Sequence, residues 1–435
     1  MHTQLSNVVS TLNCQTTSFV VKDPKAIAFE YDLQSHSTDI TQFVDLIATE
    51  AGLNRTKQKS AAKLIFLNFI VSHSEAVRLT VDNNFHMDEQ YSPLKVGIKT
   101  LVTTSGRLCA AGLIVKVTGK NLPHGNGIQT TLRPSSALCQ RLSKLKVTFE
   151  YPKLVVLRRK IEKVKVPIGY LDTMRADEIQ CQLQRYNSLL VKTKIELRDT
   201  SGVMALATPY VKRMFIDNGE VDSVGRPRFN AGGRLYAPWV SLSPTDRPNI
   251  WIDGEPTVEE DFVASYVNVM YRAVTGKTYV GDPYILSLDG EQLPRHIVKT
   301  LASMALNNGS EGSAFKAFRK KLQKLKGSKD PTKIARYKDF QSYKLDDQLA
   351  PVLTKFLNMH RPIKHLFLKG KELGNKVQCL ESDLVFSIVD KLTRADIPCL
   401  TVHDSIIVQK KYQGLVRDLM SGTIFPDREL VGWLA

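Results

Sequence analysis

The stretch Cys-Leu-Thr-Val-His-Asp-Ser-Ile-Ile-Val at residues 399–408 decides how the chain is interpreted. Two short apolar, β-prone runs flank the polar tip His403-Asp404-Ser405. This pattern predicts a tight β-hairpin that holds the Asp404 carboxylate at its turn. Aspartates are common in hairpin turns, so the segment indicates a site only in combination with others.

A second carboxylate, Asp261, follows another predicted hairpin in residues 249–262, Asn-Ile-Trp-Ile-Asp-Gly-Glu-Pro-Thr-Val-Glu-Glu-Asp-Phe. The dipeptide Asp253-Gly254 is a hairpin-turn signal, and the returning strand reaches Asp261 just before a helix-like run at 263–275 that a glycine closes. Two aspartates at strand ends, far apart in sequence, are what a two-metal phosphoryl-transfer site requires. We therefore expect Asp261 and Asp404 to be catalytic and to bind two Mg²⁺ ions.

Between the aspartates, residues 295–309 read Arg-His-Ile-Val-Lys-Thr-Leu-Ala-Ser-Met-Ala-Leu-Asn-Asn-Gly and follow a proline. The proline and the closing glycine predict a helix. Arg295, Lys299, Ser303 and Asn307 are spaced four apart, so they form one stripe along it. Two cations and an amide on one face are suited to a triphosphate and its sugar, although a solvated helix face has the same pattern.

Two further segments carry polar groups. In Asn-Ala-Gly-Gly-Arg-Leu-Tyr at residues 230–236, the glycines permit close backbone approach and Arg234 is placed to grip a phosphate. Gln378 and Asp383 lie five apart before the terminal hairpin, at the start of an apolar helix predicted at 383–394. An ordinary surface arginine and a helix N-terminal carboxylate are the alternative interpretations.

Taken in this order, the segments resemble the palm and fingers of family A (DNA polymerase I-like) polymerases and of the related single-subunit phage and mitochondrial RNA polymerases. Those families carry a T/D-x-x-G-R element, an Asp-containing motif A, an R-x3-K motif B helix and a His-Asp motif C. The matching positions are Gly233-Arg234, Asp261, Arg295 with Lys299, and His403-Asp404. Gln378 and Asp383 are similar to the Q-x4-D helix before motif C, and the resemblance covers residues 200–412.

The resemblance implies a role for each of these positions. Asp261 and Asp404 would hold the metal ions that activate a primer 3′-hydroxyl. The residues implied in nucleotide binding are Arg295, Lys299, Asn307 and Tyr266. The residues implied in primer–template binding are Arg234, Gln378, His403, Lys320 and Lys321.

The departures from the family pattern concern the choice of sugar. Motif A of family A polymerases reads D-Y-S-x-I-E-L-R, and here its acidic sugar-gate position is Tyr266 and its arginine is Asn268. A bulky Tyr266 would crowd a 2′-hydroxyl and favours deoxynucleotides, whereas Ser405 after the His-Asp pair favours the RNA polymerase relatives. We expect a DNA polymerase, with a DNA-directed RNA polymerase or primase-like enzyme as the alternative.

Other functional classes fit less well. His403-Asp404 with His360 and His365 suggests an HD-type phosphohydrolase, but such ligands lie on helices and His403 lies in a strand-like run. A Ser-His-Asp triad from residues 403–405 fails because neighbouring strand residues point to opposite faces. Zinc is disfavoured because the six cysteines include no C-x2-C pair. An inactive, polymerase-like replication protein that binds nucleic acid remains open.

The composition favours a polyanionic partner. The 435 residues carry a formal charge of +17, and residues 316–336 hold nine cations against one acid. We expect a DNA template with a DNA or RNA primer or product, together with nucleoside triphosphates, as partners. We expect no membrane contact, because no apolar run is long enough to span a bilayer. The start lacks a signal-peptide pattern and the cysteines form no framework, so we expect a cytoplasmic location in a bacterial or phage-infected cell.

The N-terminal third is predicted to be a separate domain. Helix-like segments at 39–51, 57–72 and 96–108 precede a strand after Gly112, a glycine-rich turn and a return strand from Ile128. This order resembles a winged-helix domain, in which the third helix enters a groove and the wing touches the backbone. Lys99, Arg107 and Lys120 are the candidate contacts, and a protein-binding domain of the same shape is the alternative.

The predicted fold class is therefore α+β, a right-hand polymerase core with an antiparallel palm sheet and helical fingers plus an N-terminal winged-helix-like domain. The expected domains are 1–150 (winged-helix-like), 151–230 (a linker and small helical thumb-like region, with a helix at 174–191) and 231–435 (palm and fingers, the fingers at 285–345). No exonuclease pattern precedes the core, and the chain is short for this superfamily. We expect an accessory protein subunit to help hold the template.

Overall fold

The computed structural model describes residues 27–72, 76–79, 94–119, 129–150, 153–161, 164–199, 202–206, 210–327, 331–342 and 345–422. These residues divide into two compact units. The first contains the described residues up to Thr148 apart from Asp32–Gln34, and the second contains the rest. Both units mix helices with largely antiparallel sheets, so the predicted α+β class is confirmed.

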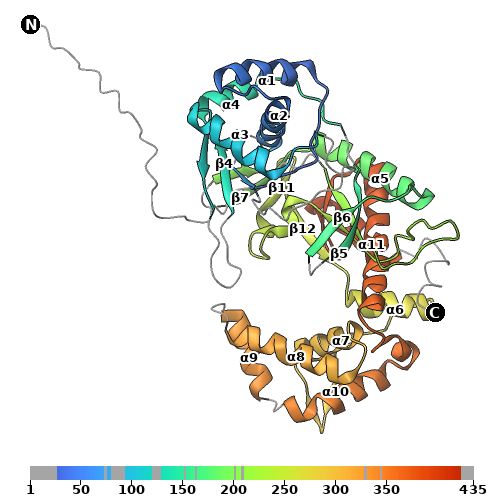
Figure 1. Ribbon diagram of the computed structural model, residues 1–435. Helices are drawn as coiled ribbons and strands as arrows, with labels where there is room; N and C mark the ends of the chain where they lie inside the picture. The colour runs from blue at the N-terminus through green and yellow to red at the C-terminus, as the bar shows by residue number, and fades with distance from the viewer. Residues whose placement is uncertain are drawn as a thin grey trace, which may run out of the picture. The chain divides into compact units, whose positions relative to one another are not determined.

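The first unit combines four helices with a four-stranded sheet (Figure 1). Its helices are α1 (Thr38–Glu50), α2 (Thr56–Val71), α3 (Ile98–Ala110) and α4 (Ser136–Leu142). Its strands are β1 (Ile27–Ala28), β2 (Val77–Leu79), β3 (Ile114–Val117) and β4 (Thr130–Pro134), in the sheet order β1-β2-β4-β3. Three helices followed by the antiparallel β3–β4 pair match the elements expected from the sequence. β2 was not predicted, and whether the unit is a winged helix stays a prediction.

The second unit contains a six-stranded antiparallel sheet with the order β15-β16-β12-β11-β7-β8. Its strands are β7 (Ile195–Asp199), β8 (Gly202–Ala205), β11 (Ile250–Ile252), β12 (Glu255–Asp261), β15 (Cys399–Val402) and β16 (Ser405–Gln409). Both predicted hairpins are present. Asp253 and Gly254 have φ angles of 49° and 79°, as the β11–β12 type I′ turn requires, and His403 has a φ of 60° in the β15–β16 turn.

A four-stranded sheet with the order β10-β9-β5-β6 belongs to the same unit. Its strands are β5 (Val155–Ile161), β6 (Val164–Ile168), β9 (Lys212–Ile216) and β10 (Gly232–Tyr236). The close approach at Gly233 is to the protein itself, because a Cβ there would lie 2.8 Å from the Phe215 ring. The glycine therefore lets β10 pack tightly on β9.

Residues 151–230, expected to form a linker and thumb-like region, contribute strands to both sheets of this unit. Helix α5 (Met174–Lys192) matches the predicted helix and contacts α11 and β5. Arg185 of α5 also pairs with Asp390 of α11 at 3.0 Å. The segment is thus built into the second unit instead of connecting two parts.

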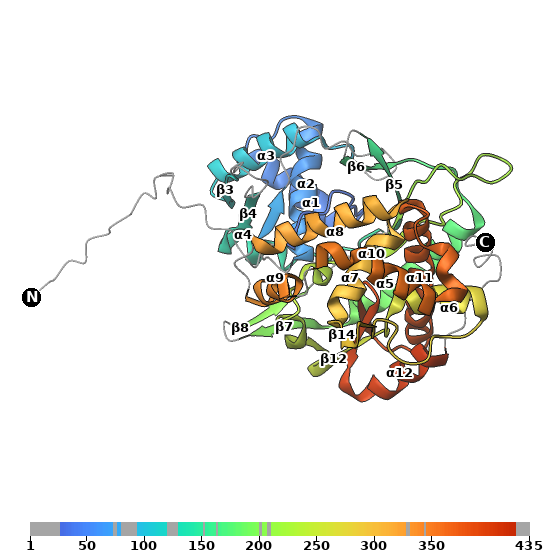
Figure 2. The ribbon, with the colours of Figure 1, turned by 90° about the horizontal axis from the view of Figure 1, so that it is seen from below.

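The remaining helices, except α12, contribute buried residues to a common apolar core. They are α6 (Ser265–Thr275), α7 (Arg295–Leu306), α8 (Glu311–Lys326), α9 (Pro331–Ser342), α10 (Leu345–Met359), α11 (Lys371–Arg394) and α12 (Gln413–Gly422). A two-stranded ribbon, β13 (Ser287–Leu288) and β14 (Glu291–Gln292), precedes α7. Short 3₁₀ turns lie at Pro238–Ser241, Arg247–Asn249, Arg361–Leu366 and Lys410–Tyr412. Buried residues of α6, α7, α10 and α11 form one cluster, and Figure 2 shows α7 and α11 from below.

Helix α11 begins at Lys371, twelve residues before the predicted start at Asp383. Its first turns carry mainly polar residues, which resemble a loop in sequence, although Gly374 and Val377 are buried. Asp383 therefore lies inside the helix, and its interpretation as a helix N-terminal carboxylate is wrong. Within the described residues, no helix is both long and apolar enough to cross a bilayer.

Candidate active site

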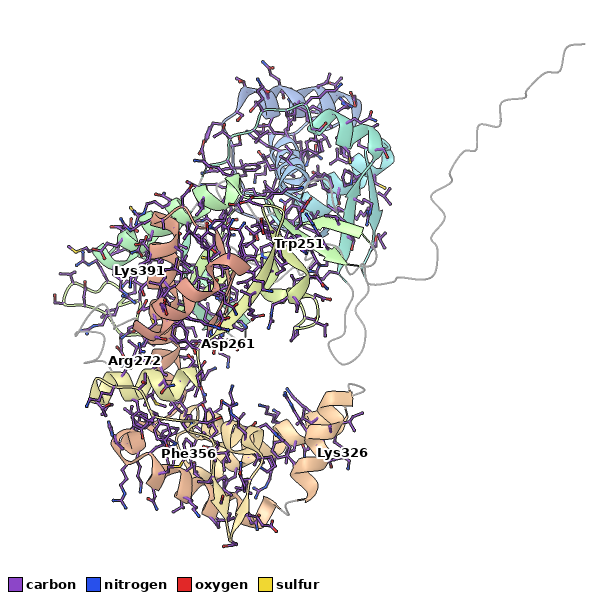
Figure 3. All side chains as sticks on the ribbon, turned by 180° about the vertical axis from the view of Figure 1, so that it is seen from behind. Trp251, Asp261, Arg272, Lys326, Phe356 and Lys391 are labelled. Atoms are coloured by element: carbon purple, nitrogen blue, oxygen red, sulfur yellow. The ribbon has the colours of Figure 1, made fainter. Side chains whose placement is uncertain are left out.

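The two hairpins bring Asp261 and Asp404 to neighbouring positions on the six-stranded sheet. β12 pairs antiparallel with β16, and Asp261 lies opposite Ser405 in the register. The backbone N–H of Phe262 donates to the carbonyl of Asp404 at 3.4 Å. Figure 3 shows Asp261 at the end of β12. Residues 261 and 404, 143 positions apart in the chain, thus form one local group.

The surroundings compensate the negative charge of this pair only in part. Within the described residues, neither carboxylate forms a side-chain hydrogen bond or an ion pair, and Arg247, whose charge reaches Asp261, is paired with Glu259. Burial and the charges of Asp404 and Glu259 raise the pKa of Asp261, while Lys299 and Arg247 oppose the rise. A bound cation would relieve this repulsion.

The donor set fits Mg²⁺. Magnesium binds oxygen ligands and is held by one or two carboxylates together with water and substrate phosphates. Among the described residues, no group of three or more His, Cys, Asp and Glu side chains has the arrangement of a complete protein-only metal site. Asp261 and Asp404 are two carboxylates of the kind that Mg²⁺ binds together with water and phosphate oxygens.

Glu259 and Arg247 were missed in the sequence. Arg247 Nε donates to Glu259 at 2.8 Å, and Ser405 Oγ lies 2.6 Å from the other carboxylate oxygen. Residues 259 and 261 are two apart on a strand, so they share a face, and this spacing was a signal that the sequence offered. Ser405 is thus engaged in holding Glu259.

Arg234 is the centre of a second group beside the aspartates. Its Nη2 donates to Glu381 of α11 at 2.9 Å and to the Tyr266 hydroxyl of α6 at 3.0 Å. Its Nε and Nη1 lie 2.8 and 3.2 Å from the side-chain oxygen of Gln378 when that amide is oriented to accept. The structure thus brings together Arg234, Tyr266 and Gln378, and adds the unforeseen Glu381. These bonds occupy the guanidinium that was expected to grip primer–template backbone.

Electrostatics couple this group to Asp404. Burial and the negative charges of Glu381 and Asp404 raise the pKa of Tyr266 to about 12. Burial and Asp404 also raise the pKa of Glu381. His403 is exposed at the turn, and partial desolvation of its ring together with the cations Arg234 and Arg247 lowers its pKa, which favours the neutral imidazole.

The stripe on α7 is present, and its members have different surroundings. Arg295 pairs with Asp282 and lies over the Tyr284 ring, 5.2 Å from its centroid. Lys299 is exposed and contributes its charge at Asp261. Asn307 caps the helix, donates to the Ser303 carbonyl at 2.9 Å and lies against Gly374, where a Cβ would approach its Oδ1 to 2.3 Å. Its amide is therefore turned toward α11.

Cations of α8 and α9 add to Lys299. Lys320 and Lys321 are exposed on α8. Partial desolvation by neighbouring groups, together with the like charges of Arg336 and Lys299, lowers the pKa of the exposed Lys321. The charges of Lys299 and Arg336 thus both reach Lys321, and these three residues are hereafter the cation group; Arg336 was missed in the sequence. Lys320 and Lys321 were expected to contact primer–template, whereas this grouping associates Lys321 with Lys299, which was expected to bind the nucleotide.

A cavity of about 530 Å³ lies beside Asp261. Its wall comes from β12, α6, α11, α12 and the loop after α6, and it includes Asn268, Arg272, Tyr279 and Glu381. Asn268, compared above with a motif A arginine, accepts from the backbone N–H of Tyr279 at 3.0 Å. Asn268 therefore positions the loop that borders the cavity.

His360, considered above as a phosphohydrolase ligand, is fully buried. Its Nδ1 lies 3.0 Å from the Tyr271 hydroxyl and its Nε2 lies 2.9 Å from the Pro283 carbonyl. Both ring nitrogens are therefore used inside the core.

In the first unit, Lys99 and Arg107 lie on α3. Lys99 is exposed, and Arg107 donates to the Gly52 carbonyl of the same unit. Lys120 lies outside the described residues. The proposed contacts of this unit with nucleic acid stay predictions.

Comparison with known proteins finds no matching family model, no similar curated protein and no similar solved structure.

Proposed function

We propose that the chain is a template-directed nucleotidyltransferase, a DNA polymerase that adds deoxynucleotides to a primer 3′-hydroxyl. The observation that carries this proposal is the convergence of Asp261 and Asp404 on neighbouring strands, without ion-pair partners in the described residues. Two unneutralised carboxylates beside a group of cations suit a reaction of metal-bound triphosphates. The resemblance to family A motifs names the same residues.

In this mechanism, Asp261 and Asp404 would hold two Mg²⁺ ions, which supply Lewis-acid stabilisation to the attacking and leaving oxygens. Lys299 and Lys321, from neighbouring helices, would bind the triphosphate. Their mutual repulsion in the free protein would be relieved when the anion binds. Arg295 would support them after releasing Asp282.

Tyr266 would contact the sugar of the incoming nucleotide. Arg234 donates a hydrogen bond to the Tyr266 hydroxyl and another to Glu381. The negative charge of Asp404 raises the pKa of Glu381. A phenol ring held there would crowd a 2′-hydroxyl, which supports the choice of deoxynucleotides. Ser405, which favoured an RNA polymerase in sequence, bonds Glu259, so its hydroxyl has a structural task.

The test is primer extension on a recessed DNA template with Mg²⁺ and each nucleotide type. Asp404→Asn should lower the rate by about a thousandfold or more, as expected when electrostatic stabilisation of the transition state is removed. The matched control is Asp289→Asn, which alters an exposed aspartate in the β13–β14 turn. Normal extension by Asp404→Asn, with wild-type thermal stability, would contradict the proposal.

A further inference from the structure

Glu381 lies at the centre of the Arg234 group and has no counterpart in the motifs discussed above. Its side chain is 3% exposed and lies in the middle of α11. It accepts hydrogen bonds from Ser265 Oγ of α6 and from Arg234 Nη2 of β10. A buried carboxylate with two donors from separate elements is held in one orientation.

The same nitrogen of Arg234 serves both Glu381 and Tyr266. Nη2 lies 2.9 Å from Glu381 Oε2 and 3.0 Å from the Tyr266 hydroxyl. A guanidinium NH₂ group carries two hydrogens, so one bond to each partner uses this nitrogen fully. The position of the Tyr266 hydroxyl is therefore tied to Glu381 through one atom.

Arg234 has a second acidic neighbour, Asp404, so its guanidinium has two carboxylates toward which it could turn. Asp404 contributes to the electrostatics of Arg234, yet the two form no ion pair. If Glu381 lost its charge, Asp404 would become the stronger acidic attraction for the guanidinium. Glu381 therefore holds Arg234 toward Tyr266 and keeps Asp404 available.

We infer that Glu381 is a positioning residue that sets sugar selection by holding Arg234 against the Tyr266 hydroxyl. This inference rests on the proposed function. Loss of the Glu381 charge releases Arg234, frees the Tyr266 ring to move and admits nucleotides with a 2′-hydroxyl. Because the released Arg234 then turns toward Asp404, overall turnover falls as well, so the inference concerns the ratio of kcat/KM for the two sugars and not the absolute rate.

The test compares kcat/KM for a deoxynucleotide and its ribonucleotide in Glu381→Gln, Glu381→Asp and wild type. Glu381→Gln should lower the preference for the deoxynucleotide by about tenfold, the size expected for a lost charge-assisted hydrogen bond. Glu381→Asp should restore part of the preference, because the charge is kept. Glu372→Gln, in the exposed first turn of the same helix, is the matched control and should leave the preference unchanged.

A double-mutant cycle separates positioning from general damage. Tyr266→Phe removes the hydroxyl, so the effects of Tyr266→Phe and Glu381→Gln should be strongly non-additive. Unchanged sugar preference in Glu381→Gln, or effects that simply multiply, would overturn the inference. If Glu381→Gln fails to fold, the cycle is run with Glu381→Asp under the same criteria.

Failure of the proposed function gives a different result. Wild-type protein that extends no primer would remove the polymerase proposal, and the crystal structure of Glu381→Gln would then decide the positioning claim. Arg234 turned toward Asp404, with Tyr266 displaced, supports it. An unmoved Arg234–Tyr266 bond refutes it.

Discussion

Two carboxylate sites in the second unit have opposite surroundings, because arginines neutralise the charge of one and not of the other. Asp383, in the middle of α11, accepts hydrogen bonds from Arg175 Nη2 at 2.9 and 3.1 Å and from Arg213 Nη2 at 2.9 Å. Arg213 is 1% exposed and Arg175 is 27% exposed, so Asp383 and Arg213 are removed from water while Arg175 keeps some contact with it. Asp261 and Asp404 have no such partners among the described residues and repel each other instead.

The contrast indicates that the Asp383 group serves the fold, and it supports the proposal that the aspartate pair binds metal ions. The Asp383 network joins α5, β9 and α11 and satisfies its charges within the chain. The aspartate pair is flanked by residues in positive-φ conformations, Ala264 and His403, which are uncommon for non-glycine residues and cost about 1–3 kcal/mol each. Strain and uncompensated charge at one place are features of binding and catalytic sites.

The largest stability effect is expected at Asp383. Asp383→Asn leaves the buried Arg213 and the half-buried Arg175 without their counter-charge and should lower the free energy of unfolding by about 3–5 kcal/mol. Asp390→Asn is the control on the same helix, since it pairs with the more exposed Arg185 and Arg394. That change should cost no more than about 1 kcal/mol. Equal losses in urea unfolding would contradict the contrast.

Mg²⁺ should stabilise the protein through the aspartate pair. An ion that binds only the folded state adds about 2.7 kcal/mol at a hundredfold excess over its Kd. Mg²⁺ should therefore raise the Tm of wild type in thermal unfolding. It should raise the Tm of the double variant, which carries both Asp261→Asn and Asp404→Asn, much less. An equal shift in the double variant would place the ion elsewhere.

The raised pKa of Asp261 predicts how metal-free stability depends on pH. Burial and Asp404 raise the pKa of this carboxyl in the folded state. Between the ordinary and the raised pKa, the folded chain binds more protons than the unfolded chain, so the free energy of unfolding falls as pH rises. Asp261→Asn removes this penalty, so at pH values above the raised pKa its free energy of unfolding should exceed that of the wild type.

The measurement is thermal unfolding of both proteins in a chelator across acidic and neutral pH. Below the ordinary pKa of aspartate, the carboxyl is protonated in both states and the advantage of Asp261→Asn should disappear. A difference in stability between the two proteins that is the same at all pH values would show that the pKa of Asp261 is not raised in the folded state. With Mg²⁺ present, wild type should be more stable than Asp261→Asn near neutral pH, because the ion favours the ionised carboxylate.

Local patterns in the sequence were sufficient for the two hairpins. Asp253-Gly254 and His403-Asp404 form the expected turns, and alternation along β12 determines which face each residue occupies. The convergence of Asp261 with Asp404 followed from treating both as strand-end residues. Helix α7 begins right after Pro294 for an equally local reason.

The roles of Glu381 and Asp383 depended on tertiary structure. Both lie in an apolar helix two residues apart, and nothing local distinguishes them. Glu381 meets β10 and α6, whereas Asp383 meets α5 and β9, because successive positions on a helix face different directions. The start of α11 was misjudged for a related reason, since tertiary packing stabilises its polar first turns.

The smallest effect is expected in the cation group, the positive counterpart of the aspartate pair. Lys321→Ala removes the cation that both Lys299 and Arg336 repel, so it should raise KM for the nucleotide about two- to fivefold, the range of an exposed charge pair, with kcat nearly unchanged. Lys324→Ala, on the same helix, is exposed and is the control. Steady-state kinetics at low and high salt check the prediction, because screening should shrink the difference. An equal rise in KM for both variants would mean that α8 acts through its total charge. The cation group would then not be a specific counterpart of the aspartate pair.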